Sequence, residues 1–162
     1  TAAYYNPTNF TFPSSAHLVQ VEVDKDTGEI EIQKYVAVED CGNVINPMVV
    51  EGQILGGIVQ GVGQALYEHG IYDDDGQLVT GSMLDYTMPR ADNFPMIESD
   101  RIETPSPSNS LGVKGVGEMG SITSPPAVVN AVVDALSDYG VKHIDMPLTS
   151  EKIWNLIKTN GG

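Results

Sequence analysis

Five glycines fall within one helix-length stretch of the chain, residues 48–67, and they constrain the fold more than any other feature of the sequence. They are Gly52, Gly56, Gly57, Gly61 and Gly63. Each glycine costs a helix about 1 kcal/mol relative to alanine, so a helix here needs a compensating reason. The usual reason is the close approach of another backbone or of a ligand. The two G-x-x-x-G spacings, Gly52/Gly56 and Gly57/Gly61, therefore predict a helix that packs tightly against a neighbour.

The charge of the chain narrows the kinds of partner that it can have. Lysine and arginine number 8 against 22 aspartate and glutamate residues, which gives a net charge of −14. A surface this negative repels phosphate backbones and anionic lipid headgroups, so the composition argues against nucleic-acid and membrane partners. Because cations are so few, backbone N–H groups would have to hold any anionic ligand.

Length and cysteine content add further expectations. A chain of 162 residues, of which 41% are hydrophobic, suits a single domain over residues 1–162. Its one cysteine, Cys41, cannot form an internal disulfide, which favours a reducing compartment such as the cytoplasm. We expect Cys41 to be a buried free thiol. No histidine has zinc-site spacing, so no metal site is expected from this chain alone, and His17 and His69 are expected to be structural or surface residues.

Two hairpins are expected in the first half of the chain. Residues 17–24 alternate between valines and polar residues, and residues 29–38 are expected to form the returning strand after a turn at 25–28. Asp73–Gly76 predicts the tip of a second hairpin, and the alternative of a calcium loop is weaker because the EF-hand ligand pattern is absent. The proline-rich stretch 88–110 is expected to be a loop.

Two helices are expected in the C-terminal part. Ser124 is a typical N-cap, Pro125 suits the first turn, and amphipathic spacing continues until Gly140 ends the helix. Residues 149–158 predict a short closing helix. Its inward-facing residues are expected to be Ile153, Trp154 and Ile157. The predicted fold class is therefore α+β, with β-hairpins packed against the glycine-rich helix and two C-terminal helices.

A literal G-x-G-x-x-G motif is formed by Gly115, Gly117 and Gly120. In a dinucleotide-binding fold this motif follows a strand and opens a helix directly. Here a loop rich in proline and serine precedes it, and Pro125 places the expected helix start beyond the last glycine. Glu118 would also put a negative charge where a pyrophosphate should sit. A free-standing nucleotide-binding enzyme therefore remains only a third hypothesis.

Glu118 itself has two interpretations. The plain one is an exposed carboxylate in a loop. The functional one is a general base, because an apolar, water-poor pocket disfavours the charged form of a carboxylate and makes it a stronger base. The residues around Glu118 do not decide between the two.

Three strings in the chain together resemble one enzyme family. They are VEVDKDTGEI…VAVEDCGNVINP, EGQILGGIVQGVGQALYE and KGVGEMGSITSPPAVVNAVVDAL. In this order they resemble the molybdenum-binding large subunit of the xanthine oxidase, aldehyde oxidase and aerobic carbon monoxide dehydrogenase family. The resemblance runs from about residue 9 to 157 and corresponds to the C-terminal part of that subunit. It implies a cofactor-binding domain of a larger subunit, either naturally split or excised.

The resemblance also implies roles for particular residues. Glu118 falls on the glutamate of the family's V-G-E motif, which is the general base for a reaction that inserts a water-derived oxygen into an electrophilic carbon. Gln53 falls on the glutamine whose side-chain amide hydrogen-bonds the pterin cofactor, and an amide can both donate and accept without adding charge. The backbone of Lys114, Gly115, Val116 and Gly117 would form the loop that runs under the cofactor.

The cofactor implied by the resemblance is molybdenum-molybdopterin, in the cytosine dinucleotide form common among prokaryotic members. It would be shared with an N-terminal molybdenum-subunit polypeptide that lies outside this sequence. A 2Fe-2S subunit and an FAD subunit would complete a hetero-oligomer that is active only as a whole. The substrate would be an aldehyde, an N-heterocycle or CO. The alternative from another class is a non-catalytic assembly or binding module that kept the fold without the activity.

Overall fold

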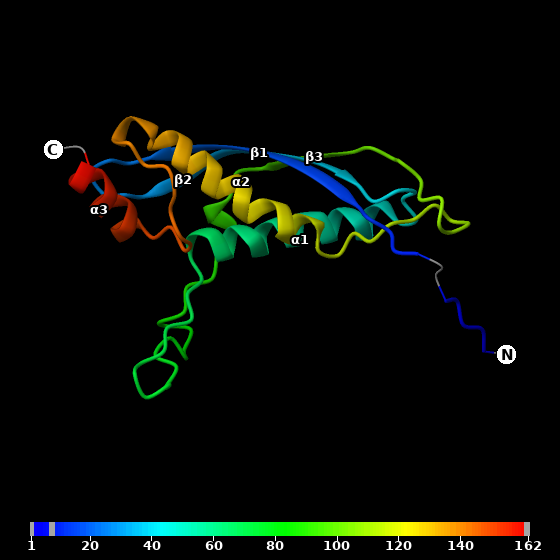
Figure 1. The fold of residues 1–162 in the computed structure, drawn as a ribbon, viewed down its shortest axis with the longest axis horizontal. Coiled ribbons are helices and arrows are strands. Elements are labelled where there is room, and N and C mark those ends of the chain that lie inside the picture. Colours follow the sequence, from blue (N-terminus) through cyan, green and yellow to red (C-terminus); the bar gives the residue numbers. More distant parts are fainter. Residues whose placement is uncertain (1, 7–8, 161–162) are drawn as a thin grey trace.

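The computed structural model describes residues 2–6 and 9–160 of the chain. The elements run in the order β1 (Ser14–Val23), β2 (Ile30–Asp40), α1 (Pro47–Leu66), η1 (Ala91–Asn93), β3 (Ile97–Arg101), α2 (Met119–Ala135), η2 (Ser137–Tyr139) and α3 (Ser150–Asn160). Figure 1 shows α1 and α2 packed beneath one face of the sheet, with α3 at one end. This arrangement confirms the α+β class. Within the described residues, no helix is both long and apolar enough to span a membrane.

The first hairpin is confirmed. β1 pairs antiparallel with β2, and Val19, Val21 and Val23 lie on the half-buried face of β1 while the residues between them are exposed. Gly28 closes the turn with φ 75° and donates its N–H to the carbonyl of Asp24 at 2.7 Å. That left-handed backbone conformation is easy for glycine and strained for other residues. The alternating pattern therefore predicts this element well, although β1 begins three residues earlier than expected.

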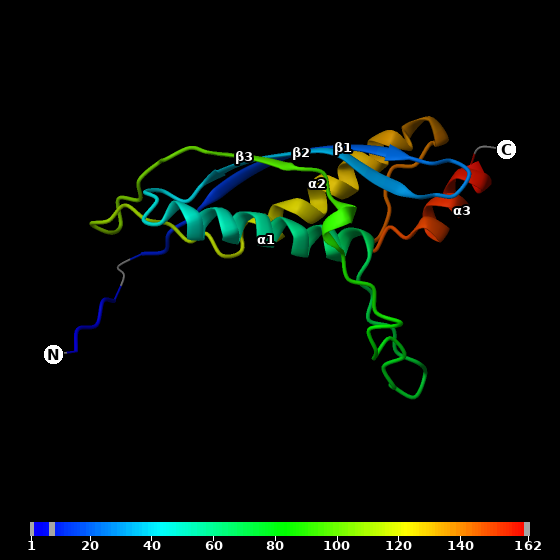
Figure 2. The same cartoon turned by 180° about the vertical axis from the view of Figure 1, so that it is seen from behind.

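A third strand lies inside the stretch that was expected to be a loop. β3 pairs in parallel with β2, with Ile97 opposite Tyr35, and it forms one edge of the sheet order β1-β2-β3. Figure 2 shows β3 beside β2, with α1 below. The sequence Ile-Glu-Ser-Asp-Arg contains three charged residues in five and no apolar alternation. Its strand structure comes from pairing with β2, which sequence periodicity does not report.

The glycine-rich helix is confirmed as α1. Asn46 caps it by accepting the Val49 N–H at 3.3 Å, and Pro47 occupies its first position. Its core side is the apolar set Val50, Ile54, Ile58, Val62, Ala65 and Leu66.

The glycines of α1 fall into two groups. A Cβ on Gly57 would lie 3.0 Å from the Ser121 nitrogen of α2, and Gly61 leaves room for Ser124. Gly57 and Gly61 therefore let the backbones of α1 and α2 approach closely, as that spacing predicts. A Cβ on Gly52 or Gly56 would meet nothing within 4 Å. The Gly52/Gly56 pair is therefore not explained by a contact among the described residues.

The expected start of the second helix is wrong. α2 begins at Met119, so Ser124 and Pro125 are buried inside it and neither forms its N-terminus. The proline cue misleads because Gly120 packs against α1, and this contact fixes the first turn of α2 before the prolines. A helix start within G-x-G-x-x-G removes one objection to a dinucleotide fold. Two objections stand, because residues 102–118 before the helix contain no strand and Glu118 would still put a negative charge where a pyrophosphate should sit.

The tip of the second hairpin is confirmed, because Tyr72 forms an antiparallel bridge with Leu78 and Asp73 donates its N–H to the Gln77 carbonyl at 3.0 Å. The pairing is an isolated bridge, so no strands flank this turn. Two smaller expectations need correction. Trp154 remains 39% exposed, whereas Ile153 and Ile157 of α3 are buried. Gly140 caps η2 with a left-handed φ, while α2 itself ends at Ala135.

The helix contact leads to a stability prediction. A Cβ on Gly120 would lie 2.5 Å from the Ile54 oxygen and 2.7 Å from the Ile58 nitrogen of α1, and backbone atoms cannot move aside easily. Gly120→Ala should lower the free energy of unfolding by about 1–3 kcal/mol. Chemical denaturation followed by circular dichroism measures this change.

Gly52→Ala is the matched control, because its Cβ meets nothing and alanine favours a helix. It should leave stability unchanged or raise it slightly. Equal effects of the two substitutions would show that the contact between α1 and α2 is looser than described.

Candidate functional site

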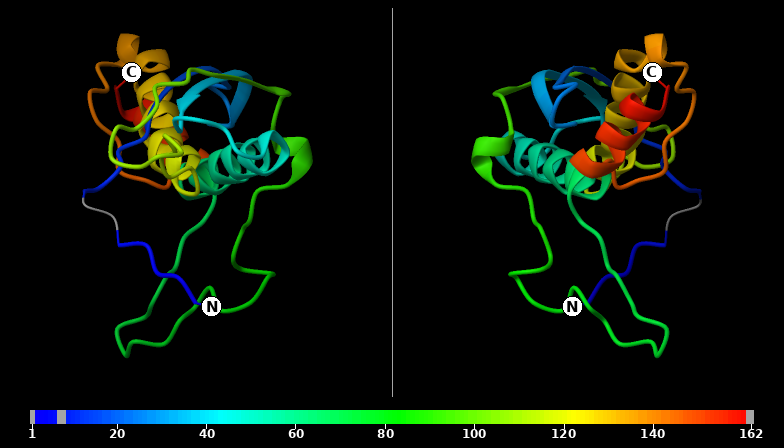
Figure 3. Two further views of the ribbon diagram at one scale, coloured as in Figure 1. Left: turned by 90° about the vertical axis from the view of Figure 1, so that its right-hand side faces the viewer. Right: turned by 90° about the vertical axis from the view of Figure 1, so that its left-hand side faces the viewer.

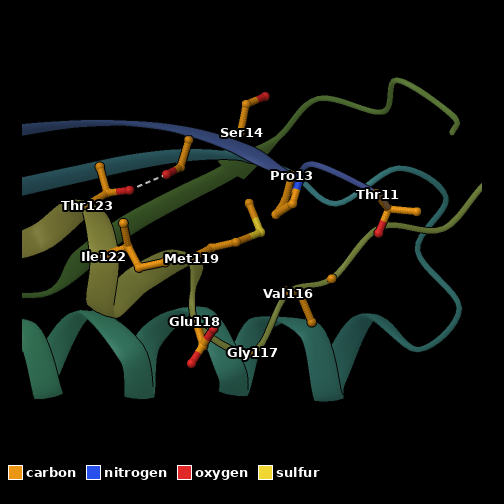
Figure 4. A pocket seen from close by; sticks show the side chains of 11 residues that line it. Thr11, Pro13, Ser14, Val116, Gly117, Glu118, Met119, Ile122 and Thr123 are labelled. Atoms are coloured by element: carbon orange, nitrogen blue, oxygen red, sulfur yellow. Dashed lines mark hydrogen bonds between the residues drawn. The ribbon is translucent and has the colours of Figure 1, made fainter. Parts of the chain in front are cut away.

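A cleft of about 630 Å³ opens where the entry to β1 meets the start of α2. It is lined by the entry segment (Thr11, Pro13, Ser14, Ser15), the loop Gly115–Glu118 and the first turns of α2 (Met119, Ile122, Thr123). Figure 4 shows these residues around the cleft, with the hydroxyls of Ser15 and Thr123 hydrogen-bonded across it. The cleft therefore includes three of the four predicted cofactor-loop residues and Glu118.

Asp40, at the end of β2, holds this loop in place. Its Oδ1 accepts the backbone N–H groups of Gly42 at 2.9 Å and Thr104 at 3.1 Å. Its Oδ2 pairs with Lys114 Nζ at 3.0 Å, and the Lys114 N–H donates to the Cys41 carbonyl at 2.8 Å. The Lys114 side chain and its backbone N–H are therefore both engaged within the chain, which leaves only its carbonyl to contact a ligand.

The environment of Asp40 also changes its acidity. Burial alone would raise the pKa of Asp40, but the hydrogen bonds from Gly42 and Thr104 and the charge of Lys114 outweigh burial. Together they hold the pKa of the Asp40 carboxyl well below its usual range. The carboxylate is therefore charged at neutral pH and locks the loop that carries the predicted site.

Glu118 is the residue immediately before α2. Its carbonyl accepts the N–H of Ile122 and the hydroxyl of Ser121, each at 3.0 Å, while its side chain makes no capping bond. Figure 4 shows the carboxylate directed away from Met119 and Pro13. The side chain is exposed, so this chain does not supply the apolar, water-poor pocket that the functional interpretation requires.

Gln53 lies beside this loop although it is distant in sequence. It is exposed on α1, and its Oε1 is 3.7 Å from the position that a Cβ on Gly117 would take. The packing of α1 against α2 therefore places the predicted amide beside Gly117, the residue that precedes the predicted base.

The loop has free hydrogen-bond donors. In the part of the chain that the structure describes, the backbone N–H groups of Gly115, Val116 and Gly117 donate to no protein acceptor. A Cβ on Gly115 would meet nothing within 4 Å, and its φ is not left-handed, so neither packing nor backbone strain in this chain requires glycine there. Open donors beside a glycine fit the close approach of a ligand rich in acceptor oxygens, such as a pterin cofactor.

A buried polar network behind the cleft was not predicted. His17 is completely buried, with Nδ1 2.8 Å from the Tyr35 hydroxyl and Nε2 2.8 Å from Glu39 Oε1. An imidazole can satisfy both partners because one ring nitrogen donates while the other accepts. Burial also raises the pKa of Tyr35. The structural role expected for His17 is confirmed, and its alternation with Val19 was the signal that it faces inward.

The remaining singled-out residues lie as expected. His69 is exposed, and Cys41 is a buried free thiol whose pKa is raised by burial. Among the residues that the structure describes, no three His, Cys, Asp or Glu side chains gather as a metal site would require.

Comparisons with known proteins agree on one family. The family model for a molybdopterin cofactor-binding domain matches residues 1–95. The chain is 42% identical over 155 residues to the carbon monoxide dehydrogenase large chain of Hydrogenophaga pseudoflava, covering 96% of this chain and 19% of that protein. It is 49% identical over 142 residues to the nicotine 6-hydroxylase large subunit of Paenarthrobacter nicotinovorans, covering 88% and 17%.

Solved structures give the same picture. The quinoline 2-oxidoreductase from Pseudomonas putida 86 superimposes with a TM-score of 0.94 at 45% identity, covering 98% of this chain and 20% of that chain. This match includes α2 and the loop before it, which lie beyond the residues matched by the family model. The chain spans about a fifth of the length of the curated relatives it matches.

The hydrogen bonds and the ion pair of the Asp40 carboxylate lead to a pH prediction. Because the pKa of folded Asp40 lies below the unfolded value of about 3.9, its contribution to stability is complete above about pH 5 and falls as the pH is lowered. Asp40→Asn should lose about 1–3 kcal/mol of stability at pH 7 and show a shallower fall between pH 5 and pH 3. Urea denaturation at a series of pH values measures both.

Asp138→Asn is the matched control, because it removes the same charge from an exposed position. It should keep the pH dependence of the unmodified chain. The same slope in all three proteins would contradict the role given to Asp40.

Proposed function

The chain belongs to the molybdopterin cofactor-binding domain family, found in the large subunits of molybdenum hydroxylases, and from this premise we propose its function. We propose that residues 1–162 act as one domain, the C-terminal cofactor-binding part of such a subunit. The enzyme would be an oxidoreductase that inserts a water-derived oxygen into an electrophilic carbon. The single observation that carries this proposal is the position of Gln53 beside Gly117, which lines one cleft together with Glu118.

Cofactor binding would use groups that the cleft leaves open. The bound molybdenum–pterin group would supply the transferable oxygen and accept two electrons from the substrate. The Gln53 amide would donate to and accept from the pterin ring, and the N–H groups of Gly115, Val116 and Gly117 would donate to its acceptor oxygens. Neutral donors suit a chain with a net charge of −14, which has few cations to offer.

Glu118 would act as the general base, taking a proton onto its carboxylate as the new carbon–oxygen bond forms. In this chain the carboxylate is open to solvent, so the water-poor surroundings would come from the bound cofactor, the substrate and the remaining polypeptide. Their arrival would disfavour the charged carboxylate and strengthen it as a base. Glu118 would therefore gain the environment of a catalytic base only in the assembled enzyme.

The wider enzyme is proposed by analogy with the relatives. The relatives include a carbon monoxide dehydrogenase and a nicotine 6-hydroxylase, which supports CO or an N-heterocycle as the substrate, and an aldehyde is a third candidate from the family resemblance. We propose the cytosine dinucleotide form of the cofactor, a 2Fe-2S subunit, an FAD subunit and an N-terminal molybdenum-subunit polypeptide as partners. The assembly would be a cytoplasmic hetero-oligomer.

The role of Glu118 can be tested by Glu118→Gln in the assembled complex. An amide keeps the shape but cannot take the proton, so turnover should fall about 10²-fold or more while molybdenum content stays unchanged. Dye reduction and metal analysis measure the two quantities. Glu151→Gln, an exposed glutamate of α3, is the control and should keep full turnover. Full turnover in Glu118→Gln would refute the base and favour a non-catalytic assembly module.

The role of Gln53 can be tested by Gln53→Leu. The substitution removes the amide from an exposed position, so it should weaken cofactor retention about 2- to 10-fold, the worth of one hydrogen bond. Molybdenum content after dialysis measures the loss. Gln64→Leu, an exposed glutamine farther along α1, should retain the cofactor. Equal retention in the two variants would remove Gln53 from the site.

A further inference from the structure

Residues 68–90 form an arm that projects from the body of the molecule. It leaves after the C-terminal end of α1 and returns just before η1. Figure 3 shows it extending on the side of α1 opposite the sheet, the side toward which the N-terminal segment also extends. Gln53 and the end of α1 are separated by 13 residues, about 20 Å of helix, so the arm lies well away from the cofactor cleft.

The arm is internally ordered. Val79 donates its N–H to the Ile71 carbonyl at 2.7 Å, and Asp73 donates its N–H to Gln77 at 3.0 Å. The Thr80 hydroxyl accepts the Ile71 N–H and donates to the His69 carbonyl, each at 3.0 Å. The arm therefore has a defined shape, and most of its residues are exposed in the part of the chain that the structure describes.

The base of the arm is fixed to α1. The Tyr86 hydroxyl donates to Glu68, and this hydrogen bond raises the pKa of Tyr86. A Cβ on Gly63 would lie 3.2 Å from Pro89 and would also meet the Glu68 carboxylate. Glycine at position 63 therefore lets both ends of the arm, at Glu68 and Pro89, pack against the helix. One glycine of the helix is thus explained by the arm.

Apolar side chains cover the arm and are exposed. They are Ile71, Tyr72, Leu78, Val79, Met83, Leu84 and Met88. Leu84 is 94% exposed and Met83 is 67% exposed. Apolar residues gathered on one ordered, projecting element mark a protein-binding surface more often than a solvated one.

Charge decides which partner fits. Residues 68–90 contain one cation, Arg90 at the returning end, and five acids, Glu68, Asp73, Asp74, Asp75 and Asp85. A second copy of this chain, with a net charge of −14, would repel such an arm. The fitting partner presents an apolar groove with a lysine- and arginine-bearing rim.

We propose that the arm docks this chain onto the remaining polypeptide of the large subunit, which carries that groove. The proposal rests on the proposed function, under which that polypeptide completes the cofactor cleft. The outer face of α1 carries the exposed, uncharged residues Val49, Gly52, Gln53, Gly56, Gln60 and Gln64. Gln53 lies beside Gly117 of the cleft-lining loop, and the arm follows the C-terminal end of the same helix. One partner on this face reaches the loop toward one end of α1 and the arm at the other.

The test uses the assembled complex, with this chain and the remaining polypeptide co-expressed. Met83→Ser/Leu84→Ser removes the two most exposed apolar side chains of the arm. It should raise the apparent Kd of the complex at least tenfold, measured as dissociation on dilution. The dependence of the Kd on salt concentration should persist, because the acidic residues of the arm are unchanged. Met96→Ser is the control, because Met96 is 88% exposed but lies outside the arm, and it should leave the Kd unchanged. Hydrogen exchange should show the backbone amides of residues 70–85 protected in the complex relative to the isolated chain.

Several results would overturn the proposal. One is a Kd for Met83→Ser/Leu84→Ser equal to that of Met96→Ser, and another is an arm that exchanges as fast in the complex as outside it. A dimer of the isolated chain that Met83→Ser/Leu84→Ser abolishes would assign the arm to a second copy instead. Failure of the proposed function is separate, because a complex with a protected arm but no molybdenum and no turnover would leave the docking role intact.

Discussion

The close contact between α1 and α2 is the constraint on which the rest of the structure depends. Gly57 and Gly61 on one helix meet Gly120 and Ser124 on the other, so the two backbones approach more closely than larger side chains would allow. This contact fixes where α2 starts, and Glu118 is the residue before that start. It also places Gln53 beside Gly117. The candidate site is therefore a consequence of helix packing more than of the local loop sequence.

The parts of the fold that the sequence predicts are those with a local physical signal. Alternation defines the first hairpin, and an Asn-Pro start followed by helical spacing defines α1. The parts that it does not predict depend on contacts between distant segments. β3 is a charged five-residue edge that exists by pairing with β2, and the start of α2 is set by Gly120 against α1 before its prolines. Trp154 was expected inside because it is apolar, but its neighbours Ile153 and Ile157 already fill the core.

The site shows the same division. Glu118, Gln53 and the glycine loop follow from family motifs, and in the structure Gly115–Glu118 line one cleft with Gln53 beside Gly117. The Asp40 lock on the loop could not be predicted, because its partners Thr104 and Lys114 come from a segment without regular structure. The buried link from Tyr35 through His17 to Glu39 needs strand register, which fixes His17 opposite Ala37 and between the two partners. Motifs therefore identify the residues that carry chemistry, while register and packing identify those that hold them.

Some glycines are explained by contacts within this chain, and others are not. Gly57, Gly61, Gly63 and Gly120 each stand where a Cβ would strike a neighbour within the chain. Gly52, Gly56 and Gly115 meet nothing and have no left-handed backbone, yet two of them weaken a helix by about 1 kcal/mol each. Gly52 and Gly56 lie close to Gln53 along α1, and Gly115 belongs to the loop with the open N–H donors. Such a glycine costs stability and has no contact inside the chain to explain it. It is typical of a surface that another molecule approaches closely. The same argument that explains the packed glycines thus points from the unpacked ones to the cofactor cleft.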